Sequence, residues 1–226
     1  MYLKLATTVE PQIEIDQFSS DAGEVSDQRF YHPLHAGRHL FHEGDEAENV
    51  YEVERGMLRL ARVMENGRRQ IVAFALPGDV VGFPEGNLHH TDCDAITDCV
   101  VLAHRRSALD RCNPNPELHR RLTRAALHEI CAMQDHFMML SSKSAAEKIA
   151  SFVLTLAERI GEPATDGIHV DIPMRRVDIA DFLGLTTETV CRTFTQFRKA
   201  GLITLETAQK AVVRDLEGLR ARAEPE

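Results

Sequence analysis

Cysteine is scarce in this sequence, and long apolar runs are absent from it. The cysteines are odd in number, scattered and without a Cys-x-x-Cys pair: Cys93, Cys99, Cys112, Cys131 and Cys191. This pattern argues against a disulfide framework and against a zinc site. No apolar run approaches the roughly 20 residues of a membrane span, and no apolar N-terminal segment precedes a cleavage site. We therefore expect no membrane partner and a cytoplasmic location.

An overall excess of basic residues is absent too. The 226 residues contain 26 Lys and Arg against 35 Asp and Glu, so the formal net charge is −9. This balance argues against a protein that is basic over its whole surface, but not against a local basic patch. Hydrophobic residues make up 43% of the chain, which is enough for a sizeable core in one large or two small domains.

Short segments between about 30 and 105 alternate apolar and polar residues and are separated by turns that contain glycine. The segment "ENGRR" at 65–69 contains Asn-Gly, which is a strong hairpin signal. Strands of this length and spacing are typical of an antiparallel roll or barrel. We predict a β-roll domain over 29–112, preceded by a polar N-terminal extension over 1–28.

A helical pattern begins after residue 113. Asn113 or Asn115 can cap this helix, and Pro116 suits its first turn. Apolar side chains then recur at spacings near three and four, among them Leu118, Leu122, Ile130, Met133, Phe137 and Leu140. The stripe is about 30 Å long, and a small roll cannot cover it. We predict a dimerisation helix over 113–143 that pairs with a second copy of the chain; the alternative is packing within the same chain.

The segment 144–226 has the pattern of a winged helix-turn-helix. A helix over about 144–160 leads into "GEPATDG", which has the composition of a linker. "RRVDIADFLGL" then predicts a short helix whose apolar side carries Val177, Ile179, Ala180 and Leu183. A glycine turn, a second helix and two short strands follow, which completes the motif. The predicted fold class is α+β: an antiparallel β-roll, a long dimerisation helix and a C-terminal winged helix-turn-helix.

The second helix of this motif, over 186–199, carries residue types that bind DNA. Its buried face is formed by Val190, Phe194 and Phe197 at helical spacing. The opposite face carries Thr187, Glu188, Cys191, Arg192 and Thr195, and basic residues for phosphate contacts flank it: Arg175, Arg176, Arg198 and Lys199. Glu accepts from cytosine, Arg donates to guanine, and a small side chain admits a thymine methyl. We predict binding to double-stranded DNA; a merely solvated face is the alternative, which the surrounding motif disfavours.

These segments resemble the CRP/FNR family of bacterial transcription regulators over about 30–215. "QIVAFALPGDVVGF", "LSSKSAAEKIASF" and "DIADFLGLTTETVCRTFTQF" are similar to its FNR and FixK branches. Those branches carry Glu-x-x-Ser-Arg in the recognition helix, which stands here as Glu188, Cys191 and Arg192. The resemblance implies an activator in low-oxygen or respiratory control that binds a TTGA-type palindrome as a homodimer. It also implies contact with RNA polymerase through roll loops such as 84–92.

Two effectors that the resemblance suggests do not fit these residues. A cyclic nucleotide needs a cation for its phosphate, but between Ile71 and His104 there is no Lys or Arg, and Glu85, Asp92 and Asp94 occur instead. An iron–sulfur cluster of the FNR type needs several thiolates, mostly in the N-terminal arm, whereas the first cysteine here is Cys93. We expect a regulator that is active without a cofactor and is controlled by its own synthesis and by direct modification.

Histidines gather in the roll sequence: His32, His35, His39, His42, His89 and His90. A metal site there would indicate an effector- or metal-sensing regulator of the same fold, or a cupin-like metalloenzyme. The His-x-His pair of cupins is absent, and a strand would place His39 and His42 on opposite faces. We therefore expect surface histidines, with no metal site, no catalytic residues and no enzyme activity.

Cys191 departs from the serine of the FNR motif, and we interpret it as a redox-sensitive residue. It lies in the first turns of a helix, where the dipole stabilises negative charge, and Arg192 is its neighbour. Oxidation to a sulfinate or sulfonate would place a negative charge beside the DNA. The alternative is that Cys191 only replaces serine as a small side chain.

Overall fold

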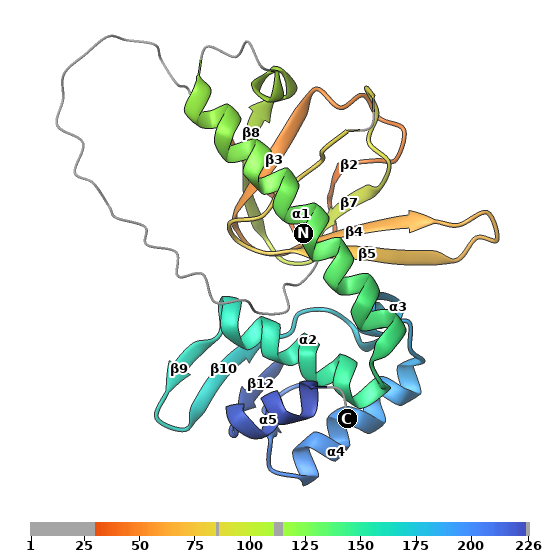
Figure 1. Ribbon diagram of the computed structural model, residues 1–226, viewed down its shortest axis with the longest axis vertical. Coiled ribbons are helices and arrows are strands. Elements are labelled where there is room, and N and C mark those ends of the chain that lie inside the picture. The colour runs from red at the N-terminus through yellow and green to blue at the C-terminus, as the bar shows by residue number, and fades with distance from the viewer. Residues whose placement is uncertain (1–29, 85, 111–114, 225–226) are drawn as a thin grey trace, which may run out of the picture.

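The structure is a computed structural model that describes residues 30–84, 86–110 and 115–224. The predicted N-terminal extension over 1–28 and Cys112 lie outside the described residues. Figure 1 shows a β-domain and a mainly helical C-terminal domain, with the long helix α1 running from one to the other. The prediction of a β-roll followed by a long helix and a helix-turn-helix is confirmed.

The β-domain consists of two four-stranded sheets in which every neighbouring pair is antiparallel, with the orders β1-β8-β3-β6 and β2-β7-β4-β5. The strands are β1 (Phe30–Leu34), β2 (His39–Phe41), β3 (Asn49–Arg55), β4 (Leu58–Val63), β5 (Arg69–Ala75), β6 (Val80–Val81), β7 (Asp92–Ala95) and β8 (Cys99–Arg105). The predicted Asn-Gly turn joins β4 to β5, and Gly67 has a φ of 76°, which glycine adopts without steric cost. Leu58, Val53 and Val101 fill the space between the sheets.

A short 3₁₀ helix (Arg106–Leu109) precedes α1 (Pro116–Ser142). The side chain of Asn115 caps α1 by accepting a hydrogen bond from the backbone N–H of Leu118 at 3.0 Å, and Pro116 is the first helical residue. One face of α1 is buried within its own chain. Leu122 packs in a cluster with Val50 and Val80 of the roll. Further along, Ala132 and Met139 are buried in the core that the roll and the C-terminal domain share, and His136 is buried beside Phe182 of α3.

A second face of α1 is apolar and exposed. It carries Leu127, Ile130, Met133, Phe137 and Met138, whose exposed fractions run from 46% to 69%. We call these five residues the α1 seam. Of the predicted interface residues, Ile130, Met133 and Phe137 belong to the seam. Leu122 was assigned wrongly because it is fully buried against the roll, while Leu118 and Leu140 are half-buried against their own chain.

The C-terminal domain begins with α2 (Ala145–Ile160), where Ser144 and Glu147 form a capping box. The helix-turn-helix is α3 (Arg176–Leu183) and α4 (Thr187–Lys199), and α5 (Leu216–Ala223) ends the described domain. A four-stranded sheet has the order β11-β12-β10-β9. Its strands are β9 (Glu162–Ala164), β10 (Gly167–Asp171), β11 (Ile203–Leu205) and β12 (Lys210–Val213).

Two details of this domain correct the sequence predictions. The segment "GEPATDG" is not a linker, because β9 and β10 pair as a hairpin and join the two wing strands in one sheet. Val177 is 39% exposed rather than part of the core, since α3 turns its Ile179, Ala180 and Leu183 face inward. None of the described helices is long and apolar enough to span a membrane.

A single apolar core connects the roll to the C-terminal domain. Phe74 of β5 lies 6.3 Å from Phe152 of α2 and 5.1 Å from Phe182 of α3, measured between ring centroids. His136 of α1 stacks on Phe182 at 4.3 Å, and burial lowers the pKa of His136 to about 4. At neutral pH this ring is therefore uncharged and packs as an aromatic side chain. The core fixes α3 and α2 against the roll.

Candidate nucleic-acid interface

The turn between α3 and α4 orients the second helix. Gly184 follows α3 with a left-handed backbone (φ 63°), which glycine adopts readily. Thr186 then caps α4, since its side-chain oxygen accepts a hydrogen bond from the backbone N–H of Thr189 at 3.1 Å. Val190, Phe194 and Phe197 are buried as predicted, so the opposite side of α4 faces outward.

The outward face of α4 carries the predicted base-reading residues. Thr187, Glu188, Cys191 and Arg192 are exposed, and Thr195 is half-buried. Within the part of the chain that the structure describes, the carboxylate of Glu188 and the guanidinium of Arg192 form no hydrogen bond or ion pair. Glu188 and Arg192 are therefore available to a ligand. The hydroxyl of Thr195, in contrast, donates to the backbone oxygen of Cys191 at 2.9 Å.

The predicted phosphate-contacting residues divide into two groups. Arg198 and Lys199 are exposed at the C-terminal end of α4. Arg175 is 68% exposed, although its Nε also pairs with Asp178 at 3.3 Å. Arg176 is placed differently from the prediction: its guanidinium carbon lies 3.8 Å from the centroid of the Phe194 ring, and burial lowers its pKa. This contact indicates that Arg176 packs against Phe194 on the buried side of α4.

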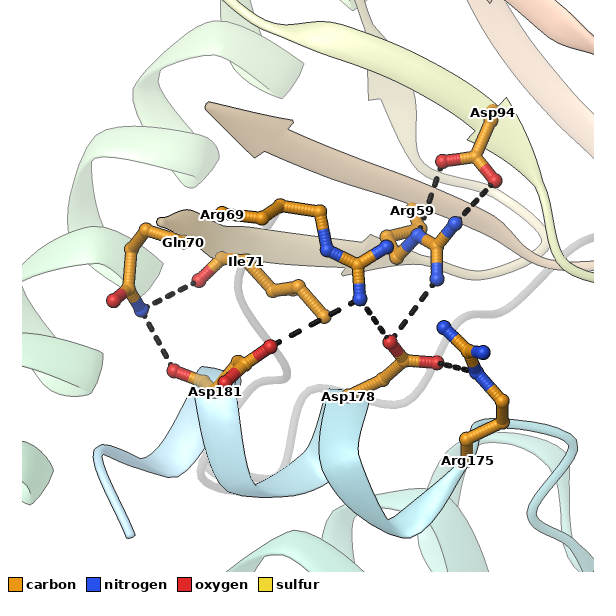
Figure 2. Close-up of polar contacts among 8 residues, drawn as sticks. All are labelled: Arg59, Arg69, Gln70, Ile71, Asp94, Arg175, Asp178 and Asp181. Carbon is orange, nitrogen blue, oxygen red and sulfur yellow. Dashed lines mark hydrogen bonds and ion pairs between the residues drawn. The ribbon is translucent and has the colours of Figure 1, made fainter. Parts of the chain in front are cut away.

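An ion-pair cluster that the sequence analysis did not identify joins the roll to α3 (Figure 2). At its centre is Asp178, whose side chain is only 3% exposed. Arg59 of β4 pairs with Asp178 at 3.1 Å and makes two hydrogen bonds to Asp94 of β7, at 3.0 and 2.7 Å. Arg69 of β5 donates to the same Asp178 oxygen as Arg59, and Arg175 donates to the other oxygen. We call these residues the Asp178 cluster.

Two further contacts hold the same domains together. The side-chain amide of Gln70 donates to the backbone oxygen of Asp181 at 2.7 Å, which ties β5 to the end of α3 (Figure 2). On α2, Arg159 makes two hydrogen bonds of 3.0 Å to the carboxylate of Asp79 in the roll. The orientation of the helix-turn-helix is thus fixed by polar contacts on two helices as well as by the apolar core.

The carboxyl group of Asp178 is ionised although it is buried. Burial alone would raise the pKa of this carboxyl. The hydrogen bond from Arg175 and the charges of Arg59, Arg69 and Arg175 outweigh burial and lower the pKa overall. Asp178 is therefore a carboxylate at neutral pH, and the cluster contains a buried negative charge that three arginines compensate.

Comparison with known proteins identifies this arrangement. The profile of the Crp-like helix-turn-helix domain matches residues 147–222, and that of the cyclic nucleotide-binding domain matches 31–112. The nitrogen fixation regulation protein FixK of Azorhizobium caulinodans is 40% identical over 183 residues, which cover 80% of this chain and 74% of that protein. FixK of Rhizobium meliloti is 34% identical over 217 residues and covers 96% of this chain and 97% of its own.

A solved structure gives the same result in three dimensions. FixK2 from Bradyrhizobium japonicum matches with a TM-score of 0.78 and 32% identity, covering 88% of this chain and 98% of that one. The chain belongs to the CRP/FNR family, in its FixK-like branch. As a CRP/FNR protein it is a transcription regulator with a helix-turn-helix that binds DNA.

One cavity beside the roll of this CRP/FNR chain is small. A cavity of about 80 Å³ lies between the roll and α1, and its lining includes Gly82, Phe83, His89 and Glu129. Ligand pockets usually measure about 300–1,000 Å³. No Lys or Arg is among the described residues that line the cavity, and burial raises the pKa of Glu129. These residues do not fit a cyclic nucleotide, whose phosphate needs a cation.

Two histidines of the CRP/FNR roll lie closer together than predicted. The rings of His39 and His42 stack with their centroids 4.2 Å apart. The expectation that they point to opposite faces of a strand is wrong. Strand β2 ends at Phe41, and its pairing with β7 shifts register between His39 and Phe41, so His42 already belongs to the following turn.

Proposed function

We propose that this FixK-like regulator activates transcription in the cytoplasm as a homodimer on a TTGA-type palindrome, with one α4 reading each half-site. We further propose that its targets are genes of low-oxygen or respiratory metabolism. The observation that carries the DNA-reading proposal is the outward face of α4, where Glu188 and Arg192 are exposed and without a side-chain partner among the described residues.

The chemistry of this face supports the reading of specific bases. The N-terminal part of a recognition helix meets base edges, and Glu188, Cys191 and Arg192 lie in that part of α4. A carboxylate accepts from the amino group of cytosine, and a guanidinium donates two hydrogen bonds to guanine. The small side chain of Cys191 leaves room for a thymine methyl. Thr187 and Thr195 flank this set, while Arg198, Lys199 and Arg175 are placed for phosphates.

The dimer is proposed to form through the α1 seam. The five seam residues give each chain a continuous apolar surface that its own roll and C-terminal domain leave exposed. Pairing of two such helices would bury this surface and set two copies of α4 on the two halves of a palindrome. RNA polymerase is the proposed second protein partner, and roll loops over 84–92 are its proposed contact surface.

Substitution of Glu188 or Arg192 by Ala is expected to relax sequence preference. Each change should remove about 1–3 kcal/mol of discrimination against a wrong base pair. The measurement is a titration of the dimer on the TTGA-type palindrome and on singly mutated versions of it. Lys199→Ala is the matched control, because losing a phosphate contact should weaken binding to all sequences alike and reduce the salt slope by about 1. Unchanged preference in Glu188→Ala would contradict the proposed role.

We also propose that oxidation of Cys191 switches DNA binding off. The thiol is exposed on the outward side of α4, and the guanidinium of Arg176 is near enough to interact with it electrostatically. Peroxide oxidises a thiol to a sulfinate or sulfonate while it is itself reduced to water. The product would place a permanent negative charge against the phosphates and base edges.

Peroxide is expected to lower the DNA affinity of the wild type by roughly 5- to 150-fold, the cost of about 1–3 kcal/mol in one base contact. Cys191→Ser should bind normally and keep its affinity after peroxide. Cys131→Ser is the matched control, because Cys131 is exposed too but lies on α1; this variant should remain sensitive. If Cys191→Ser loses affinity as the wild type does, the sensitive group lies elsewhere.

A further inference from the structure

A group of three possible metal ligands lies on the surface of the roll, away from the recognition helix. The group consists of His39 on β2, His42 in the next turn and Asp92 at the start of β7, and it is the one such group among the described residues. One ligand atom of each residue lies within 4.8 Å of the other two. Nδ1 of His42 lies 3.4 Å from a carboxylate oxygen of Asp92.

Backbone contacts hold these three residues in place. The N–H of Glu43 donates to Asp92 at 3.0 Å, which fixes the carboxylate beside the turn. The N–H of His42 donates to the side chain of Asp45 at 2.8 Å, which closes that turn. The register shift in β2 then brings the ring of His42 over the ring of His39. The backbone therefore brings these three residues together.

We infer that His39, His42 and Asp92 form a binding site for a divalent transition-metal ion such as Zn²⁺, Co²⁺ or Ni²⁺. Imidazole nitrogen suits these ions, whereas Mg²⁺ and Ca²⁺ prefer sites made of oxygen ligands alone. Zinc takes nitrogen and carboxylate ligands at about 2.0–2.2 Å, so two such ligands in a tetrahedral shell lie about 3.4 Å apart. Both histidines are exposed, and small rotations of their side chains bring the three ligand atoms to this spacing. Water completes the coordination.

The bound ion would clamp β2 and the turn after it to β7. This turn supports the adjacent loop: the N–H of Gly44 donates to the backbone oxygen of His89, and the N–H of His89 donates to the backbone oxygen of Asp45. A metal bridge would therefore stabilise this edge of the roll. The site is independent of the DNA contacts of α4, so it can be tested without DNA.

Isothermal titration calorimetry of the protein with Co²⁺ is expected to show one ion bound per chain. Thermal unfolding is expected to give a higher unfolding temperature with Co²⁺ than without it. The experiment uses the Cys131→Ser, Cys191→Ser background, which removes as competing ligands the two thiols that are exposed among the described residues. The cobalt spectrum should lack a thiolate charge-transfer band. Titration with Mg²⁺ should show no stoichiometric binding.

His39→Gln, His42→Gln and Asp92→Asn should each weaken Co²⁺ binding by more than about tenfold, because even the loss of a residue that only supports a ligand costs about 10- to 100-fold. His35→Gln is the matched control: His35 also lies beside a carboxylate, Asp98 at 3.5 Å, but no further histidine from the described part of the chain joins them in a ligand group. Its affinity should be unchanged. Absence of stoichiometric binding, or equal binding by His42→Gln and the wild type, would overturn the inference.

Discussion

Asp178→Asn is expected to lower the free energy of unfolding by about 3–5 kcal/mol, the usual cost of removing one partner from a buried ion pair. The amide keeps the size of the side chain but removes its charge. Arg59 and Arg69, whose side chains are 16% and 32% exposed, would then face each other with one compensating charge fewer. Urea unfolding monitored by circular dichroism measures the change. DNA affinity should fall as well, because α3 loses its main polar anchor to the roll.

Asp181→Asn is the matched control for this cluster. Asp181 lies on the same helix and pairs with the same Arg69, but at 3.9 Å and with 28% of its side chain exposed. Pairs of this kind contribute about 0–1 kcal/mol. If Asp178→Asn costs no more than Asp181→Asn, the buried cluster does not hold the domains together.

The pH dependence gives a second test of the same residue. The pKa of Asp178 is lower in the folded protein than its ordinary value, which is about 3.9 in an unfolded chain. The stabilisation by its charge is therefore fully present above about pH 4 and is lost as the pH falls through the folded pKa. The wild type and Asp178→Asn should differ most at neutral pH, and their stabilities should converge in strong acid.

Ile130→Glu is expected to convert the proposed dimer into monomers and to abolish tight binding to the proposed palindrome. Ile130 lies in the α1 seam and is 52% exposed in the single chain. In a paired seam, the new carboxylate would be buried without a partner, which costs several kcal/mol per chain. Sedimentation velocity measures the oligomeric state, and DNA titration measures the loss of two-site binding.

A charge change at another position of α1 tests whether a new charge by itself, and not its place in the seam, disrupts the dimer. Asp135 is exposed and is not part of the seam, so Asp135→Lys should remain dimeric. Ile130→Ala removes apolar area without adding charge and should give a weaker dimer. A dimeric Ile130→Glu would show that the seam is not the interface.

Helices and turns that depend on the local spacing of apolar residues and glycines were predictable from the sequence. The spacing of Val190, Phe194 and Phe197 is enough to orient α4, and the Gly184 turn places it after α3. The division of α1 into two faces was not predictable. Leu122 and Ile130 both fit one apolar stripe, and only the position of the roll decides that the first is buried and the second exposed.

The polar clusters depend on contacts that sequence patterns do not contain. Arg69 and Asp178 are 109 positions apart, and an aspartate in the first turn of α3 has the pattern of an ordinary exposed helix end. Arg176 likewise has the pattern of a basic flank, yet it packs on Phe194. The pairing of His39 with His42 depends on a register shift in β2, for which "HLFH" contains no local signal. Long-range packing decided each of these positions.

Phe74, Phe152 and Phe182 belong to one core, so the roll and the helix-turn-helix each complete the interior of the other. If the C-terminal domain were exchanged for that of another regulator, the aromatic side chains of β5 on one side, and of α2 and α3 on the other, would lose their packing partners. Substitutions on the exposed outward face of α4, in contrast, leave this core untouched.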